Sequence, residues 1–411
     1  VFYCKPTLDT EMNYKNEYHA STQTPDVFWL DKAKEINWFK TPTTGCTRAG
    51  NGYYEWFKDG ELNTSYLALD THVNAGKGDK VALIFDSPVT GVTQRFTYSE
   101  LLKHVAQFAG ALSQLGVKKG DRVIIYMPMI PQAAIAMLAC ARLGAIHSVV
   151  FGGFAANELA VRIDDAQPTL IVTASCGIEG KKILPYKPLI DEAISIAKFK
   201  PKGCVVFQRE QLEAELVPGF DYNWADIIIN SQPAVPTPVG ATDPLYVLYT
   251  SGTTGKPKGV VRDNGGHAVA LHYSMQAIYG IDEQDTFWAA SDVGWVVGHS
   301  YIVYGPLIKG ATSVMYEGKP VGTPDAGAFW RMIEKHSINV LFAAPTAFRA
   351  IRKEDPDAKY LTQYDTSSLR TLFMAGERLD PPTYYWAAEK VGVPVVDHWW
   401  QTETGWPICA N

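Results

Sequence analysis

The chain alternates between short, continuous apolar runs and longer segments in which apolar residues recur every three or four positions. Runs of the first kind predict strands that are buried on both faces, and segments of the second kind predict helices that cover them. This alternation is typical of α/β proteins with mostly parallel sheets. Strands are predicted at 81–85, 122–127, 147–151, 170–172, 205–207, 245–249, 286–290, 311–316, 338–342, 372–374 and 393–396.

Local signals mark where several helices begin and end. Thr97 and Glu100 form a capping box that opens a helix, and Gly116 stops it. Pro131 begins a second helix, which ends near Gly144. Further helices are predicted at 155–165, 187–198, 265–280 and 325–337, with one more between the last two strands.

One segment interrupts this order. Residues 232–244 hold four prolines and few apolar residues, which indicates a linker or subdomain boundary. We therefore expect two tandem, doubly wound α/β subdomains, 61–231 and 245–411. Residues 1–60 show no clean period and are rich in Trp, Tyr and Phe. For them we expect an arm with short helices that packs on the main body.

The composition fits a protein of this size with two or three folded units, because 46% of its 411 residues are hydrophobic. A formal net charge of −6 argues against a nucleic-acid surface. The longest apolar stretch, 123–156, is too often interrupted by polar residues and prolines to span a bilayer. None of the six cysteines forms a CxxC pair, so we expect reduced thiols in an intracellular protein.

The sharpest chemical signal is the segment Tyr-Thr-Ser-Gly-Thr-Thr-Gly-Lys-Pro-Lys-Gly at 249–259, which follows a predicted strand. Its glycines let backbone N–H groups approach an anion, and its hydroxyls and lysines add donors and charge. The segment differs from a Walker A loop, which has four residues between its glycines. A flexible surface loop is the alternative. The predicted phosphate-binding residues are Thr250, Ser251, Gly252, Thr253, Thr254, Gly255, Lys256 and Lys258.

A second candidate segment, 397–404, lies at the carboxyl end of a predicted strand, where ligands bind in open α/β sheets. The carboxylate of Glu403 suits Mg²⁺, which prefers one or two carboxylates together with phosphate oxygens. Thr402 can donate to a phosphate, and Asp397 can accept from an adenine amino group. Taken alone, Glu403 would be read as a solvated surface carboxylate. No GxGxxG follows the first strand, which argues against a dinucleotide enzyme.

The chain resembles the adenylate-forming superfamily of acyl-CoA synthetases, luciferases and adenylation domains, and within it the short-chain acyl-CoA synthetases. The resemblance starts from the phosphate segment and extends along almost the whole chain. It is carried by 56–63, 86–89, 126–128, Phe151-Gly-Gly-Phe154, Ser291-Asp-Val-Gly-Trp295, 344–346, Gly376-Glu377 and Trp399-Trp-Gln-Thr-Glu-Thr-Gly405.

The resemblance implies a large domain in which two sheets and three layers of helices alternate as αβαβα. It also implies a catalytic set of Lys256, Thr402 and Glu403, with Glu403 holding the metal. The implied AMP site consists of Gly376, Glu377, Arg378, Asp397, His398, Trp399, Trp400, Gln401 and Thr402. The implied CoA site consists of Gly152, Gly153, Glu179, Gly180, Lys181 and Lys182, in which Glu179 replaces a residue that is often basic.

The resemblance places Val296, Val297, Ala375 and Trp400 in the acyl pocket. All four are apolar, and the indole of Trp400 restricts the pocket to short tails. Acetate enzymes tend to have a larger residue at 375 and Thr at 297, so this pocket favours propionate. One methylene is worth roughly 1–3 kcal/mol, which predicts a bias and not an absolute choice. Trp406 also suits the propionate group.

We therefore expect ATP-dependent conversion of propionate to acyl-AMP and then to acyl-CoA. ATP, Mg²⁺ and coenzyme A enter as substrates, with no tightly bound cofactor, and the expected location is the cytoplasm or the mitochondrial matrix. The family's ribose-binding Asp and small C-terminal domain would follow Asn411, so we expect little activity from this chain alone. The alternatives are an acetate–CoA ligase, an enzyme that loads a carrier-protein thiol, and a non-catalytic nucleotide-binding fragment.

Overall fold

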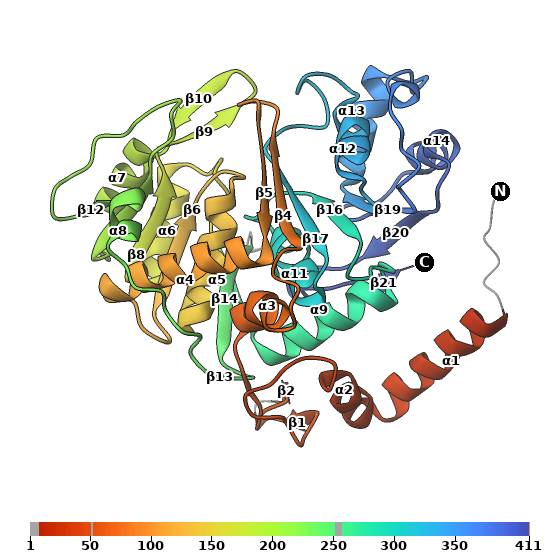
Figure 1. Cartoon of the computed structure of the whole chain (residues 1–411), viewed down its shortest axis with the longest axis horizontal. Helices are drawn as coiled ribbons and strands as arrows, with labels where there is room; N and C mark the ends of the chain where they lie inside the picture. Colours follow the sequence, from red (N-terminus) through yellow and green to blue (C-terminus); the bar gives the residue numbers. More distant parts are fainter. Residues whose placement is uncertain (1–7, 51, 251–256, 411) are drawn as a thin grey trace.

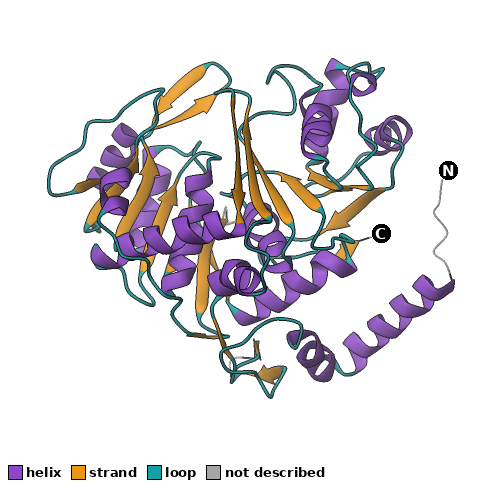
Figure 2. Cartoon of the chain, viewed as in Figure 1, coloured by secondary structure: helices purple, strands orange, loops and turns teal. Residues whose placement is uncertain are grey.

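The computed structural model describes residues 8–50, 52–250 and 257–410, and for 8–13 the backbone only (Figure 1). Two large sheets form its frame, and helices lie between and outside them (Figure 2). The seven-stranded sheet has the spatial order β12 (Asp221–Asn223), β11 (Gly203–Phe207), β8 (Leu170–Ala174), β6 (Arg122–Tyr126), β7 (Ile146–Val149), β14 (Pro244–Thr250) and β15 (Lys258–Asp263).

The eight-stranded sheet is parallel except at its two edges, where β5 (Val92–Thr97) and β21 (Cys409–Ala410) run antiparallel to their neighbours. Three small two-stranded sheets complete the described strands: β1 (Cys46–Arg48) with β2 (Tyr54–Trp56), β3 (Glu61–Leu62) with β13 (Val239–Gly240), and β9 (Cys176–Glu179) with β10 (Lys182–Pro185). The order in the eight-stranded sheet is β21 (Cys409–Ala410), β20 (Val395–Trp399), β19 (Thr371–Met374), β18 (Val340–Ala343), β16 (Thr286–Ala290), β17 (Thr312–Tyr316), β4 (Val81–Ser87) and β5 (Val92–Thr97).

The helices fall into three layers around the two sheets. Those of the described residues are α1 (Leu8–Gln23), α2 (Pro25–Ala33), η1 (Tyr66–Asp70), α3 (Thr71–Asn74), α4 (Tyr98–Gln114), α5 (Pro131–Leu143), α6 (Ala156–Ala166), α7 (Lys187–Ile196), α8 (Trp224–Ile229), α9 (Gly265–Ala277), α10 (Val296–Gly298), η2 (His299–Tyr304), α11 (Gly305–Lys309), α12 (Ala328–His336), α13 (Pro345–Glu354), η3 (Leu361–Gln363) and α14 (Pro381–Val391).

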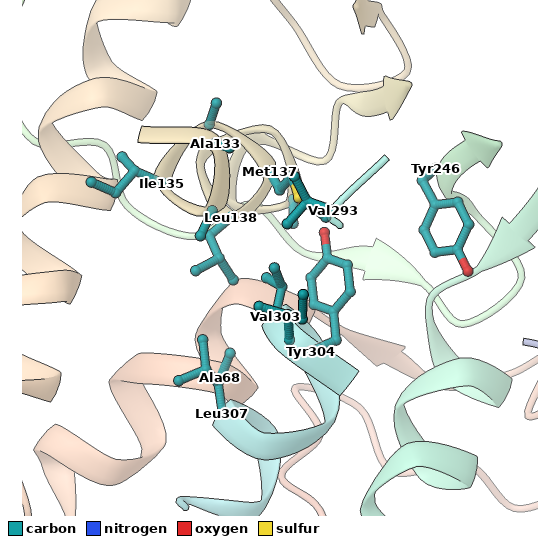
Figure 3. Packing of buried hydrophobic residues seen from close by; sticks show 14 of the residues in the cluster. Ala68, Ala133, Ile135, Met137, Leu138, Tyr246, Val293, Val303, Tyr304 and Leu307 are labelled. Atoms are coloured by element: carbon teal, nitrogen blue, oxygen red, sulfur yellow. The ribbon is translucent and has the colours of Figure 1, made fainter. Parts of the chain in front are cut away.

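Alternation of side chains along the strands explains the layers. In β6, Val123 and Ile125 pack in the central cluster with α4 and α5, whereas Ile124 and Tyr126 pack outward with α6 and α7. The outer face of the eight-stranded sheet is covered by α12, α13 and α14. Figure 3 shows part of the central cluster, where Leu138 of α5 lies opposite Val303 of η2. The predicted α/β class and αβαβα layering are confirmed.

The helix signals read from the sequence have the expected structural roles. The Thr97 hydroxyl accepts from the Glu100 amide, and the Glu100 carboxylate accepts from the Thr97 amide at 2.8 Å, so the capping box is present. Gly144 ends α5 in the left-handed conformation, with a φ of 67°. Several predicted boundaries are off by a few residues: the strand expected at 338–342 is β18 at Val340–Ala343, and the helix expected at 265–280 is α9, which ends at Ala277.

The two sheets exchange strands across the predicted subdomain boundary. β4 and β5 come from the first half of the sequence, yet β4 pairs with β17 in the eight-stranded sheet. β14 and β15 come from the second half, yet β14 pairs with β7 in the seven-stranded sheet. The boundary at 232–244 therefore does not divide the strands between the sheets. Periodicity shows which residues are buried, but it carries no information about pairing over long separations.

The proline-rich segment 232–244 is an ordered strap across α4 and α5. Its Ala234 amide donates to the carbonyl of Ala106 at 2.9 Å, and its Thr237 amide donates to that of Arg142 at 2.8 Å. The Arg142 side chain donates to the Ala234 carbonyl and makes a bidentate pair with Asp70, whose shorter contact is 2.7 Å. These contacts give the segment a defined position on α4 and α5.

Residues of the N-terminal helix α2 pack on α9 through aromatic side chains. The rings of Phe28 and Trp29 in α2 meet Tyr273 edge to face, at 5.8 and 5.4 Å. The first helix, α1, is longer than the short helices expected and projects from the body (Figure 1). Within the described residues, no helix combines the length and apolar character that crossing a membrane requires.

Three buried histidines surround the ring of Tyr246 in the central layer. The rings of His147, His267 and His299 lie 5.5, 5.5 and 4.6 Å from it, centroid to centroid. Burial lowers the pKa of His299 to about 4 and the pKa values of His147 and His267 well below the ordinary value of 6.5, and for His267 and His299 the charge of Arg262 adds to the effect. These rings are neutral in the folded protein at pH 7.

Acidification is therefore expected to destabilise the fold well above the pH at which carboxylates protonate. Because these histidines bind protons in the unfolded chain near pH 6.5 but not in the folded one, their contribution to stability is complete above 6.5 and declines as the pH falls towards 4. Each can contribute a slope of up to about 1.4 kcal/mol per pH unit. Urea unfolding between pH 7.5 and 5 measures it.

The variant His299→Gln should reduce that slope by up to about 1.4 kcal/mol per pH unit, which corresponds to one bound proton. The variant His19→Gln, at an exposed position, should leave the slope unchanged. A free energy of unfolding that stays constant over this pH interval would contradict the burial of neutral histidines.

Candidate active site

The predicted phosphate segment connects two antiparallel strands at the edge of the seven-stranded sheet. β14 ends at Thr250 and β15 begins at Lys258, and these two residues are paired in register. The strand β15 was not predicted from the sequence. Ser251, Gly252, Thr253, Thr254, Gly255 and Lys256 lie outside the described residues, so their assignment to phosphate remains a prediction.

The two predicted AMP segments follow neighbouring parallel strands. β19 and β20 pair with Met374 opposite Asp397, so Gly376 and Asp397 lie at the same carboxyl edge of the eight-stranded sheet. Gly376 has a φ of 102°, a conformation that favours glycine. The carboxylate of Asp397 has no hydrogen-bond partner among the described residues, and partial burial raises the pKa of this group.

The other residues of these segments differ in exposure and in the contacts they already make within the chain. Gly376, Glu377, Arg378 and Gln401 are exposed, and Trp399 is 56% exposed. The Glu377 carboxylate is held by Arg349 at 2.5 Å and by the Thr346 amide at 2.8 Å. These contacts fix the segment that follows β19 beside α13.

The side chain of His398 does not face this surface. It is buried, and its Nδ1 donates to the carbonyl of Met374 at 2.8 Å, so its Nε2 accepts from the hydroxyl of Tyr279 at 3.1 Å. Burial lowers the pKa of the ring to about 4. Alternation along β20 explains the difference, because consecutive side chains point to opposite faces. Only the backbone of His398 remains for the predicted AMP contact.

The loop after β20 is held by an arginine that the sequence reading did not single out. The guanidinium of Arg262, on β15, donates to the carbonyls of Thr402 at 2.7 Å, Glu403 at 3.0 Å and Thr404 at 3.1 Å. The hydroxyl of Ser300 donates to the Gly405 carbonyl at 2.6 Å. The sequence could have indicated this role, because Arg262 directly follows the apolar residues Val260 and Val261, and a charged side chain in such a place needs partners within the protein.

The loop places Glu403 where a metal ion can reach it. Its carboxylate is exposed and has no ion-pair or hydrogen-bond partner among the described residues, whereas Thr402 is half-buried. Within the described ranges, no cluster of three or more His, Cys, Asp or Glu side chains is arranged to hold a metal. This donor set fits Mg²⁺, which binds one or two carboxylates and completes its shell with water and phosphate oxygens.

The predicted acyl-pocket residues lie in the central layer. Val296, Ala375 and Trp400 are buried members of its apolar cluster, and Val297 packs against it. The indole of Trp400 meets the rings of Tyr301 and Phe342 at 5.6 and 6.0 Å. Trp400 is therefore fixed by aromatic neighbours on one side while its chain leads directly into the loop at 402–405.

The predicted CoA residues lie in two separate segments. Gly152 and Gly153 follow β7, and a Cβ at Gly152 would lie 2.3 Å from the hydroxyl oxygen of Tyr186, so close packing already requires glycine there. The ring of Phe151 lies 5.4 Å from that of Trp295, which brings this loop beside Val296.

The second CoA segment is the turn of the β9–β10 hairpin. Gly180 has a φ of 61°, and Lys181 and Lys182 are exposed. Glu179 pairs with Lys319 at 2.7 Å, so its charge is compensated within the chain. A pair of exposed lysines can bind phosphate as point charges, without the bidentate geometry of arginine.

Comparison with known proteins identifies the family to which the chain belongs. A sequence profile described as AMP-binding enzyme matches residues 69–411, and one described as acetyl-coenzyme A synthetase N-terminus matches residues 14–68. The chain belongs to the AMP-binding enzyme family. Within this family, the resemblance to adenylate-forming short-chain acyl-CoA synthetases is confirmed by the relatives.

The relatives match nearly the whole chain but extend beyond it. It is 52% identical over 399 residues to the human protein named acyl-CoA synthetase short-chain family member 3, mitochondrial, covering 97% of this chain and 58% of that protein. It is 46% identical over 402 residues to propionate–CoA ligase of Salmonella typhimurium, covering 97% and 63%. An uncharacterized protein of Pseudomonas aeruginosa is 58% identical over 399 residues, covering 97% and 64%. The chain thus spans about three fifths of the length of these relatives.

Proposed function

We propose that this chain carries the acid-activating site of an enzyme that joins a short-chain carboxylic acid to AMP at the expense of ATP and then to coenzyme A. The observation that carries the proposal is the junction at Trp400. Trp400 is buried in the apolar central layer, and Glu403, only three residues later in the chain, has an exposed carboxylate. An apolar acyl tail and a charged phosphate would meet at that junction.

The residues suggest a division of work in the first half-reaction. The carboxylate of the acid attacks the α-phosphorus of ATP and pyrophosphate leaves, a displacement that depends on positioning and charge neutralisation. Asp397 and the backbone of 376–378 would hold adenine, and Thr402 would donate to a phosphate oxygen. Glu403 would hold Mg²⁺, which neutralises charge on the phosphates when bound. The thiol of coenzyme A then attacks the acyl-AMP and releases AMP.

Propionate is the acid that the pocket favours. Ala375 leaves space for about one more methylene than a larger residue would, and Val297 offers an apolar wall. The name of the Salmonella typhimurium relative, propionate–CoA ligase, supports this assignment. Acetate is the second candidate, since residues 14–68 match a profile described by acetyl-coenzyme A synthetase. ATP, Mg²⁺ and coenzyme A would all enter as substrates, and none of them would be a tightly bound cofactor.

Calorimetric titration with AMP esters of ethanol, propanol and butanol tests the acid preference, because these esters mimic the three acyl-AMPs. We expect the propyl ester to bind tightest, and Ala375→Val to weaken its binding by roughly 10-fold or more relative to the ethyl ester, since one methylene is worth roughly 1–3 kcal/mol. Ala347→Val, a half-buried position in α13, serves as the matched control.

Tightest binding of the ethyl ester would identify an acetate enzyme. If none of the esters binds to this chain or to the full-length gene product, the proposed adenylation site is wrong.

A further inference from the structure

We propose that Arg262 is a positioning residue that locks the loop of Thr402 and Glu403 to the strand that leaves the phosphate segment. The inference rests on the proposed function and adds a residue to its site. Arg262 lies on β15, four residues after Lys258, where that segment rejoins the sheet. One side chain thereby links β15 to the loop that carries the proposed metal ligand.

The geometry of the guanidinium suits this task. Four of its five N–H donors are used: three reach the consecutive carbonyls of Thr402, Glu403 and Thr404 at 2.7–3.1 Å, and Nε donates to the hydroxyl of Tyr246 at 3.3 Å. Charge-assisted hydrogen bonds of this kind are roughly twice as strong as neutral ones. Lysine could not reproduce the fork, because its donors leave from a single atom.

The loop itself is built around the guanidinium. Gly405 has a φ of 75°, and a Cβ there would lie 2.7 Å from the central carbon of the Arg262 guanidinium. The next constraint along the loop is the 2.6 Å hydrogen bond from Ser300 to the Gly405 carbonyl. Four successive carbonyls, from Thr402 to Gly405, are therefore fixed by two side chains.

The partners of Arg262, which is half-buried, distinguish it from two fully buried arginines. Arg142 and Arg209 neutralise buried carboxylates at 2.7 and 2.8 Å, whereas the described residues place no carboxylate within ion-pair distance of the Arg262 guanidinium. Residues 401–406 form no helix or strand, and the carboxylate of Glu403 has no described partner of its own. The direction in which Glu403 points is consequently set by its backbone, and its backbone is set by Arg262.

The test compares Arg262 with Arg122, which has the same chemistry away from the site. Arg122, on β6 of the same sheet, donates to the carbonyls of Ala166 at 2.8 Å, Gln167 at 3.1 Å and Gly120 at 3.5 Å. Arg262→Met, Arg262→Lys and Arg122→Met are made in the full-length gene product. Each is measured by urea unfolding, by hydrogen exchange of the 401–406 amides, by calorimetric titration with the propyl AMP ester, and by ATP–pyrophosphate exchange at varied Mg²⁺.

We expect Arg262→Met to speed exchange of the 401–406 amides at least 10-fold, to weaken ester binding at least 10-fold, and to raise several-fold the Mg²⁺ concentration for half-maximal pyrophosphate exchange. Arg262→Lys should recover only part of each loss, and Arg122→Met should change none of them. Unchanged amide exchange and binding in Arg262→Met, full recovery by Lys, or equal losses in Arg122→Met would each overturn the proposal.

Failure of the proposed function gives a different pattern. In that case the unsubstituted protein shows no acid-dependent pyrophosphate exchange, while amide exchange at 401–406 still decides whether Arg262 fixes the loop.

Discussion

Replacing Glu403 by Gln is expected to lower acid-dependent ATP–pyrophosphate exchange by roughly 10²–10³-fold, because the site then lacks its negatively charged metal ligand. Among the described residues, no group of three or more His, Cys, Asp or Glu side chains could hold the metal in its place. The loss should be in the turnover rate and in the Mg²⁺ requirement. The free energy of unfolding should change by less than about 0.5 kcal/mol, since the carboxylate is exposed.

Glu389→Gln provides the matched control, because this glutamate is exposed on α14 and pairs only with its neighbour Lys390 among the described residues. It should retain full activity. If Glu403→Gln exchanged pyrophosphate within twofold of the unsubstituted protein, Glu403 could not be the metal ligand and the proposed site would need another.

Replacing Arg209 by Met is expected to reduce the free energy of unfolding by about 3–5 kcal/mol, because it leaves the buried carboxylate of Glu317 without a counter-charge. The pair is bidentate, at 2.8 and 3.0 Å, and the hydroxyl of Ser87 donates to the same carboxylate at 2.8 Å. Arg209 follows β11 and Glu317 follows β17, so the pair clamps the two large sheets together. Urea unfolding at pH 7 measures the loss.

The nearby pair of Lys319 and Glu179 is the control, since more than half of each side chain is exposed. Lys319→Met should cost less than about 1 kcal/mol. The double variant Arg209→Met with Glu317→Leu should recover much of the loss, as apolar replacement of a buried pair is often near neutral. A cost for Arg209→Met as small as that for Lys319→Met would refute the clamp.

Local order was predictable from the sequence because local contacts produce it. The capping box at Thr97 and the glycine that ends α5 act through atoms a few residues apart, and both are present as predicted. The strand β15 was missed because its apolar run is short and interrupted by Arg262 and Asp263. The exchange of β4 and β14 between sheets was missed because those pairings join residues far apart in the sequence.

The candidate site also combines features that were predictable from the sequence with features that were not. Strand ends and residue types indicated Asp397, Thr402 and Glu403, and the structure places them along one short segment at the carboxyl edge of a sheet. The face on which His398 lies could not be fixed, because a shift of one residue in the expected end of β20 reverses its direction. Arg262 has its role only through carbonyls about 140 residues away, which no local pattern reveals.

The exchanged strands have a consequence for synthesis on the ribosome. The apolar strand β4 leaves the exit tunnel more than 200 residues before its partner β17 is made. At roughly 5–20 residues per second, that delay is on the order of 10–40 s, during which the nascent strand has only β5 as a native neighbour in its sheet. A gene divided between residues 231 and 245 would therefore encode two polypeptides that each leave one sheet incomplete, and they should become insoluble when expressed apart and regain solubility only when produced together.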